Sequence, residues 1–197
     1  MLLIYLILLE MKAIKYITVI ILLSAGLLPA PTDSRAQDSW ITRQEMKKIR
    51  EARLQANFKI IDTLLKQKDF VLKAQYLQNR YGDRITVTPL LNFIKVEGET
   101  GVLQTGSTMG LGLNGVGGVT ATGRIGKWQL LPDEKRLIHT LKFSLLTNIG
   151  HYDVTMTVRP DGNSRATISG IGNDKLTWEG EIEVSGNSRV FKGHNTF

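Results

Sequence analysis

The sequence predicts a mainly β fold, an antiparallel meander of about eight strands that forms a small barrel or a sandwich, preceded by one α-helix. Apolar residues alternate with polar residues along several segments after residue 69. Turn residues punctuate the same region at hairpin spacing, and the chain holds 19 glycines against 5 prolines. Barrel and sandwich both fit these patterns, although closure removes exposed strand edges.

The composition excludes several classes of protein. The 197 residues are 42% hydrophobic and 22% charged, which argues against a disordered or collagen-like chain. The sequence has no cysteine, so it has no disulfide framework, thiolate zinc site or cysteine nucleophile. The net charge is +7, and residues 42–68 carry eight Lys or Arg against three Asp or Glu. The excess of positive charge is therefore local.

Residues 1–36 have the layout of a secretory signal peptide. A short basic region precedes the apolar run Ile17–Leu28, and small side chains lie at the two positions that a signal peptidase reads, ending at Ala36. The run of 12 residues is shorter than the ~20 needed to span a bilayer, which favours cleavage over a permanent membrane anchor. We expect cleavage after Ala36, a periplasmic or secreted location without a transmembrane span, and Met11 as the true initiator.

Residues 37–68 are predicted to form the N-terminal helical segment. A capping box begins at Thr42, and neither Gly nor Pro interrupts a helix from about Arg43 to Gln67. The second half has an apolar stripe at helical spacing, made of Leu54, Phe58, Ile61 and Leu65. We expect residues 54–65 to dock on the body and residues 43–53 to project as a solvated basic arm. A binding surface is the less favoured interpretation of that arm.

Residues 69–197 are predicted to form the antiparallel β-domain. Period-two alternation predicts strands with one buried face and one wet face. The predicted inward rows are Phe70, Leu72, Ala74 and Tyr76; Leu137, His139, Leu141, Phe143 and Leu145; Tyr152, Val154, Met156 and Val158; and Leu176, Trp178, Gly180, Ile182 and Val184. Glu179, Glu181 and Glu183 alternate with the last row, which favours a solubilising edge.

Five inward residues are the candidate ligand-binding residues. They are Tyr76, Phe143, Tyr152, Trp178 and His139. An eight-stranded barrel is at the size where side chains either fill the interior or leave room for one small ligand, and a filled core is the default. A lone histidine on an apolar face is more often a core or rim residue than a ligand.

The glycine-rich segment Gly106–Gly126 holds eight glycines. It includes a G-x-G-x-x-G pattern at Gly110–Gly115, but strand-like residues follow where phosphate binding needs a helix N-terminus. We interpret the pattern as accidental. The glycines predict tight bends, a bulged strand or a close approach of another segment, and a flexible lid is the weaker alternative.

Motifs for catalysis are lacking in the sequence. It has no His-x-His pair, no His-Glu-x-x-His zinc motif and no Gly-x-Ser-x-Gly elbow. His151 falls on a wet face, and His194 lies in a tail that we expect to fray. The sequence therefore predicts no metal, no cofactor and no enzymatic activity.

Several short motifs carry a resemblance to a known family. They are Asn92–Gly98, Gln104–Gly106, Asn114–Gly123, Trp178–Gly180 and Ser188–Gly193. With them the chain resembles the exported Bacteroidetes domain-of-unknown-function family 4251, over nearly its whole length after the signal peptide. The resemblance implies an envelope or secreted location. It implies no activity and supplies no catalytic residues.

These observations favour an exported, non-enzymatic domain that binds a small apolar or amphipathic ligand inside a lipocalin-like barrel. The alternative is a structural or interaction module of the cell envelope that uses the basic N-terminal helix. An outer-membrane barrel is less favoured, because the strands lack aromatic girdles. The expected partner is a small lipophilic ligand or an envelope component, with no nucleic acid. A packed interior favours the module, and a cavity of several hundred Å³ favours the carrier.

Overall fold

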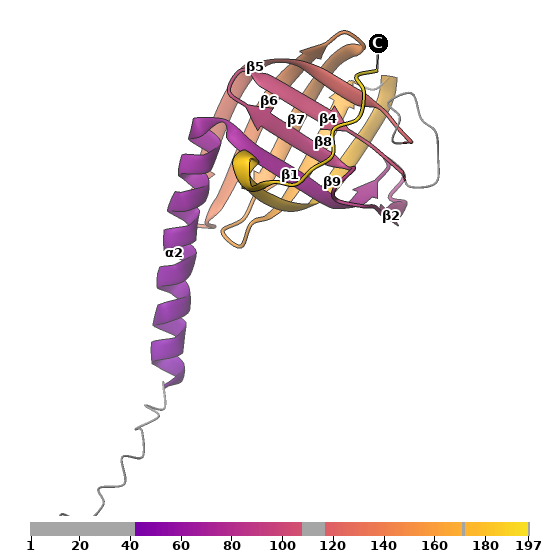
Figure 1. Ribbon diagram of the computed structural model, residues 1–197. Coiled ribbons are helices and arrows are strands. Elements are labelled where there is room, and N and C mark those ends of the chain that lie inside the picture. The colour runs from indigo at the N-terminus through magenta and orange to yellow at the C-terminus, as the bar shows by residue number, and fades with distance from the viewer. Residues whose placement is uncertain (1–41, 108–116, 171, 197) are drawn as a thin grey trace, which may run out of the picture. The chain divides into compact units, whose positions relative to one another are not determined.

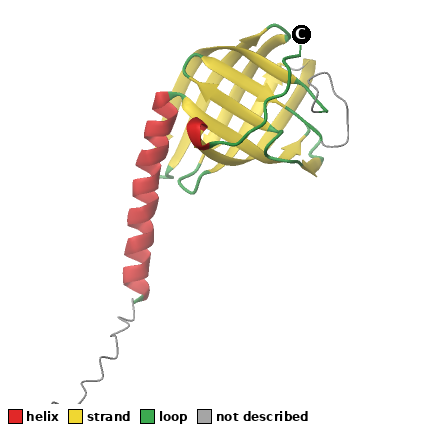
Figure 2. Cartoon of the chain, viewed as in Figure 1, coloured by secondary structure: helices red, strands yellow, loops and turns green. Residues whose placement is uncertain are grey.

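The computed structural model describes residues 42–107, 117–170 and 172–196. Helix α2 (Arg43–Gln67) precedes nine antiparallel strands (Figures 1 and 2). The strands are β1 (Asp69–Gln78), β2 (Arg84–Thr86), β3 (Phe93–Glu97), β4 (Thr100–Gln104), β5 (Thr120–Asp133), β6 (Ile138–Thr147), β7 (Gly150–Val158), β8 (Asn163–Gly170) and β9 (Gly172–Val184). A short 3₁₀ helix, η2 (Ser185–Asn187), follows them.

The sheet closes on itself as a barrel. Consecutive strands from β3 to β9 pair as a meander, and β1 pairs with β3 on one edge and with β9 on the other. Eight strands thus form the barrel, while β2 adds a short pairing to the end of β1. The predicted fold class is confirmed, and the choice between barrel and sandwich is decided by the register that runs from Phe70↔Val184 to Gln78↔Thr177.

Alternate side chains of the strands fill the barrel. The predicted inward row of β7 is confirmed, because Tyr152 and its alternate neighbours are buried. The predicted row of β6 is confirmed from His139 to Leu145, but Leu137 precedes the strand and is only half-buried. The second half of α2 adds Ile61, Leu64 and Leu65 to the same cluster. The helix contacts β1, β5 and β6. One hydrophobic core therefore joins the helix to the barrel.

Helix α2 has the bounds that the sequence predicts, and residues 43–53 are exposed as expected. Leu54 is only half-buried, so docking begins at Phe58. The helix ends where Lys68 adopts a φ of 52°, a left-handed conformation that glycine usually supplies at this position. The Lys68 ammonium lies 2.6 Å from the Glu99 carboxylate, which ties this junction to the turn between β3 and β4.

The predicted inward position of Tyr76 is wrong. A β-bulge between Ala74 and Tyr76 inserts one unpaired residue into β1, and a shift of one residue exchanges the two faces of a strand. Leu77, paired with Trp178, therefore points into the core, whereas Tyr76 lies half-buried on the outer face opposite Glu179.

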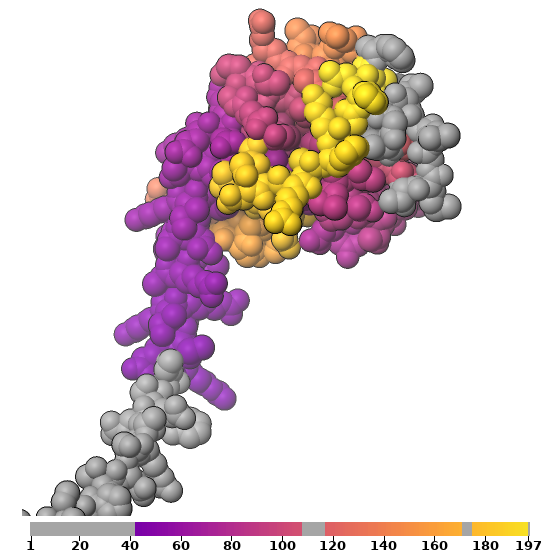
Figure 3. Space-filling view, in the orientation of Figure 1, coloured from indigo at the N-terminus to yellow at the C-terminus, as the bar shows by residue number. Residues whose placement is uncertain are grey.

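The C-terminal segment lies along the outside of the barrel, where Figures 1 and 3 show it in yellow. The expectation that this tail frays is wrong. Gln104 is fully buried; its amide donates to the carbonyl of Phe191 at 2.7 Å and accepts from the Gly193 N–H at 2.8 Å. A small outer cluster of Val71, Phe93 and Val102 packs against Val190 of this segment. The wall formed by β1, β3 and β4 is thus buried on both faces.

The glycine-rich segment is described only in part. The Gly110–Gly115 pattern lies outside the described residues, and so the lid interpretation stays a prediction. The expected close approach is confirmed at Gly123, where a Cβ atom would lie 2.0 Å from the carbonyl oxygen of Leu146. The expected bulge is confirmed in β5, where the register shifts between Gly126 and Gln129.

Candidate functional surfaces

The barrel interior holds three of the five candidate ligand-binding residues. Phe143, Tyr152 and Trp178 are 3%, 6% and 1% exposed. Trp128 packs on Phe143 with ring centroids 5.3 Å apart. Burial raises the pKa of the Tyr152 phenol. These side chains belong to one hydrophobic cluster with the aliphatic core, as in a filled interior.

His139 lies on the inward face of β6 at its contact with α2. Its ring is 1% exposed and stacks on Phe58 at 4.1 Å between centroids. Within the described residues neither ring nitrogen makes a hydrogen bond of good geometry; the nearest charge is the Asp62 carboxylate, 3.4 Å from Nε2. Burial lowers the pKa of His139 below the usual 6.5, although Asp62 opposes the change. His139 is thus a neutral core residue beneath the helix.

The N-terminal half of α2 forms a basic exposed surface, which we call the basic arm and define as residues 43–53. Its basic residues are Arg43, Lys47, Lys48, Arg50 and Arg53, against Glu45 and Glu51. Lys47 lies 3.9 Å from Glu51, whereas Arg50 and Arg53 make no ion pair with any described residue. Met46 and Ile49 are 54% and 55% exposed on the arm.

A groove of about 380 Å³ crosses the outer face of the barrel. We call it the arginine groove and define it by its lining residues Gln75, Tyr76, Arg84, Thr157, Arg159, Asn163, Ser164, Arg165, Glu179 and Gly180. The strand order β2-β1-β9-β8-β7 brings them together from five strands and the turn after β7. Tyr76 reaches this groove because of the bulge that turned it outward.

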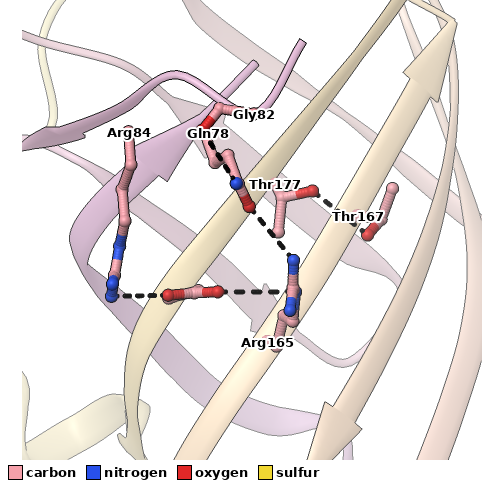
Figure 4. A network of polar contacts seen from close by, with 7 residues as sticks. Gln78, Gly82, Arg84, Arg165, Thr167 and Thr177 are labelled. Atoms are coloured by element: carbon pink, nitrogen blue, oxygen red, sulfur yellow. Dashed lines mark hydrogen bonds and ion pairs between the residues drawn. The ribbon is translucent and has the colours of Figure 1, made fainter. Parts of the chain in front are cut away.

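Two of the groove's arginines are held in place by a shared carboxylate (Figure 4). One carboxylate oxygen of Glu179 lies 2.6 Å from the Arg84 guanidinium. The other oxygen lies 3.5 Å from the Arg165 guanidinium. The Arg84 guanidinium also lies over the Tyr76 ring, 3.8 Å from its centroid. Arg165 donates to the Gln78 side-chain oxygen at 3.1 Å. Sequence reasoning missed this cluster, because only the barrel register places β2, β8 and β9 residues in one row.

The glutamates of β9 are not a solubilising edge, contrary to the sequence interpretation. β9 pairs on both sides, with β8 and with β1, and has no free edge. The Glu183 carboxylate forms an ion pair with the Lys73 ammonium at 2.8 Å. The Glu181 carboxylate accepts a longer hydrogen bond, of 3.4 Å, from the Gln75 side-chain amide. These two contacts cross the β1–β9 seam, whereas Glu179 contacts Arg84 of β2 and Arg165 of β8.

The residues that carry the family resemblance hold the barrel together. Asn92 is fully buried, and its amide donates to the Gly106 carbonyl at 2.9 Å and accepts from the Gly106 N–H at 3.0 Å. Gln104 binds the C-terminal segment as described above. At Gly180, a Cβ atom would lie 1.8 Å from the Lys73 carbonyl oxygen. These motif residues therefore have structural roles.

Across residues 42–107, 117–170 and 172–196 no three His, Asp or Glu side chains are grouped so that they could bind a metal ion. In the same ranges no helix has the length and apolarity to cross a membrane.

Comparisons with known proteins agree with the sequence motifs. No curated protein matches the chain. The crystal structure of a DUF4251 family protein from Bacteroides eggerthii is similar, with a TM-score of 0.58 and 26% identity, covering 71% of this chain and 95% of that one. The profile of the domain of unknown function DUF4251 matches residues 52–182, well over half of the sequence. On this match the chain belongs to the DUF4251 family.

Proposed function

We propose that the protein is an exported, non-enzymatic interaction module that attaches to an anionic lipid surface of the cell envelope through its basic arm. The observation that carries this function is the arm itself, a helical extension that is exposed throughout and carries five basic residues against two acidic ones. Basic residues beside exposed apolar side chains such as Met46 and Ile49 suit binding at the interface of an anionic bilayer.

The packing of the barrel supports the module over a carrier of apolar ligands. Aromatic side chains occupy the centre, where a carrier needs space, and they are almost completely buried. Two hollows of about 380 and 370 Å³ in the described part of the chain are lined largely by polar residues. A packed barrel suits a rigid support for the helix.

Vesicle binding tests the role of the arm. The purified protein should co-sediment with phosphatidylglycerol vesicles but not with phosphatidylcholine vesicles, and binding should weaken as salt rises, because the attraction is electrostatic. The triple variant Lys47→Glu, Arg50→Glu and Arg53→Glu should lose binding at least tenfold.

A matched variant separates the arm from total charge. Arg124→Glu, Lys142→Glu and Lys175→Glu change the net charge equally at exposed barrel positions and should retain vesicle binding. Equal loss in both triple variants, or a wild-type protein that binds only a soluble acidic polysaccharide, would contradict attachment through the arm.

Export is tested separately from attachment. The apolar run Ile17–Leu28 and the small residues before Gln37 support processing by signal peptidase. N-terminal sequencing of the protein recovered from its native cells should begin at Gln37. Recovery of an unprocessed chain from the cytosolic fraction would contradict export without bearing on the vesicle experiment.

A further inference from the structure

We infer that the arginine groove binds a small acidic sugar, a hydroxyl-bearing ring with one carboxylate or phosphate group. This site is independent of the basic arm, since it is formed by β1, β2, β7, β8 and β9 and contains no residue of α2. Its volume of about 380 Å³ is at the lower end of the range of ligand pockets, which suits a monosaccharide or disaccharide.

The charge of the groove favours an anion. Its charged lining residues are Arg84, Arg159, Arg165 and Glu179, a balance of two positive charges. Glu179 forms ion pairs with Arg84 and Arg165 and so neutralises part of their charge. The Arg159 side chain makes no ion pair or hydrogen bond with any described residue. Arg159 is therefore available to a ligand anion, which a guanidinium binds through two parallel hydrogen bonds.

The arginines are positioned before any ligand arrives. Arg165 is held by Glu179 and by Gln78, and Arg84 is held by Glu179 and by the Tyr76 ring. Fixing long side chains in advance removes part of the entropy that binding would otherwise cost. A surface charge that serves only solubility does not need this support.

Neutral polar groups complete the lining and favour a ligand with hydroxyl groups. Gln75, Thr157 and Asn163 present amide and hydroxyl groups beside the arginines. The Arg84 guanidinium covers one face of Tyr76, the aromatic ring in the lining. The ligand is therefore recognised by charge and hydrogen bonds, which an acidic sugar supplies and a lipid tail does not.

Isothermal titration calorimetry of the intact protein tests the site with four probes: glucuronate, glucose 6-phosphate, glucose and inorganic phosphate. At least one acidic sugar should bind ten times more tightly than both glucose and inorganic phosphate, and the better of the two identifies carboxylate or phosphate as the preferred anion. Arg159→Gln should weaken that binding roughly tenfold or more, because a charge-assisted contact is lost.

The control is Arg124→Gln, which removes an exposed arginine from β5, outside the groove, and should leave the affinity unchanged. The Arg159 side chain makes no ion pair or hydrogen bond with any residue that the structure describes, so thermal unfolding of the Arg159→Gln variant should match the wild type and show that the fold is intact. Inorganic phosphate binding as tightly as the sugars would overturn the inference. So would no binding by either acidic sugar, or an equal effect of both substitutions.

Discussion

At the scale of the residue, His139 makes stability depend on pH. Burial beneath Phe58 lowers its folded pKa below the usual 6.5, and Asp62 only partly offsets the effect. The unfolded chain therefore binds a proton more readily than the folded chain as the pH falls through 6.5. The free energy of unfolding therefore keeps its full value above pH 6.5 and decreases as the pH falls below it.

Thermal unfolding between pH 7.5 and pH 5.5 measures this dependence. The wild-type melting temperature should fall over this range, and His139→Gln should flatten the fall because it removes the titrating group. His151→Gln is the matched control, since His151 is 47% exposed, and it should leave the profile unchanged. A His139→Gln profile as steep as the wild type would show that other groups cause the pH dependence.

At the scale of the element, Gln104 fastens the C-terminal segment to the barrel. Its amide donates to the Leu91 and Phe191 carbonyls and accepts from the Thr120 hydroxyl and the Gly193 N–H. Gln104→Ala removes these contacts, at a cost of about 1–3 kcal/mol for each backbone group that stays buried without a partner. We expect release of the tail, with faster amide hydrogen exchange at Phe191, Gly193 and Thr196.

Limited trypsin digestion gives a second measurement of the same release. Cleavage after Arg189 and Lys192 should be faster in Gln104→Ala than in the wild type, because the tail spends more time away from β4. Gln129→Ala changes the same residue type at an exposed position of β5 and should behave like the wild type. Unchanged exchange and digestion in Gln104→Ala would mean that the outer cluster around Val190 holds the tail alone.

At the scale of the whole molecule, closure depends on the seam between β1 and β9. Beside the bulge at Ala74–Tyr76, the Lys73 carbonyl lies so close to Gly180 that a Cβ atom there would be 1.8 Å from its oxygen. Gly180→Ala forces the two strands apart and should destabilise the protein by about 1–3 kcal/mol, as overpacking does. Urea unfolding measures the change.

Gly186→Ala is the control for closure, because a Cβ atom there would meet no atom within 4 Å. Its free energy of unfolding should stay within ~0.5 kcal/mol of the wild type, as for other surface changes. Equal stability of the Gly180→Ala variant would show that the seam adjusts to the extra methyl group, and that closure does not depend on this glycine.

The sequence predicts elements well wherever local pattern and burial agree. The bounds of α2 follow from uninterrupted helix formers between Thr42 and Lys68, and the inward row of β7 follows from strict alternation. Prediction failed at Tyr76, where one bulge exchanged the faces, and at the tail, whose partner Gln104 lies more than 80 residues away. The arginine groove was not predicted, since it depends on register across five strands.

The sequence by itself determined a helix, several of the strands and most of the core, because these depend on periodicity within short windows. Only the tertiary structure decided that β1 meets β9, that Tyr76 faces outward, and that Arg84 and Arg165 share Glu179. The physical reason is that pairing between distant strands depends on hydrogen-bond register and close backbone approach. Neither quantity is written in the local order of apolar and polar residues.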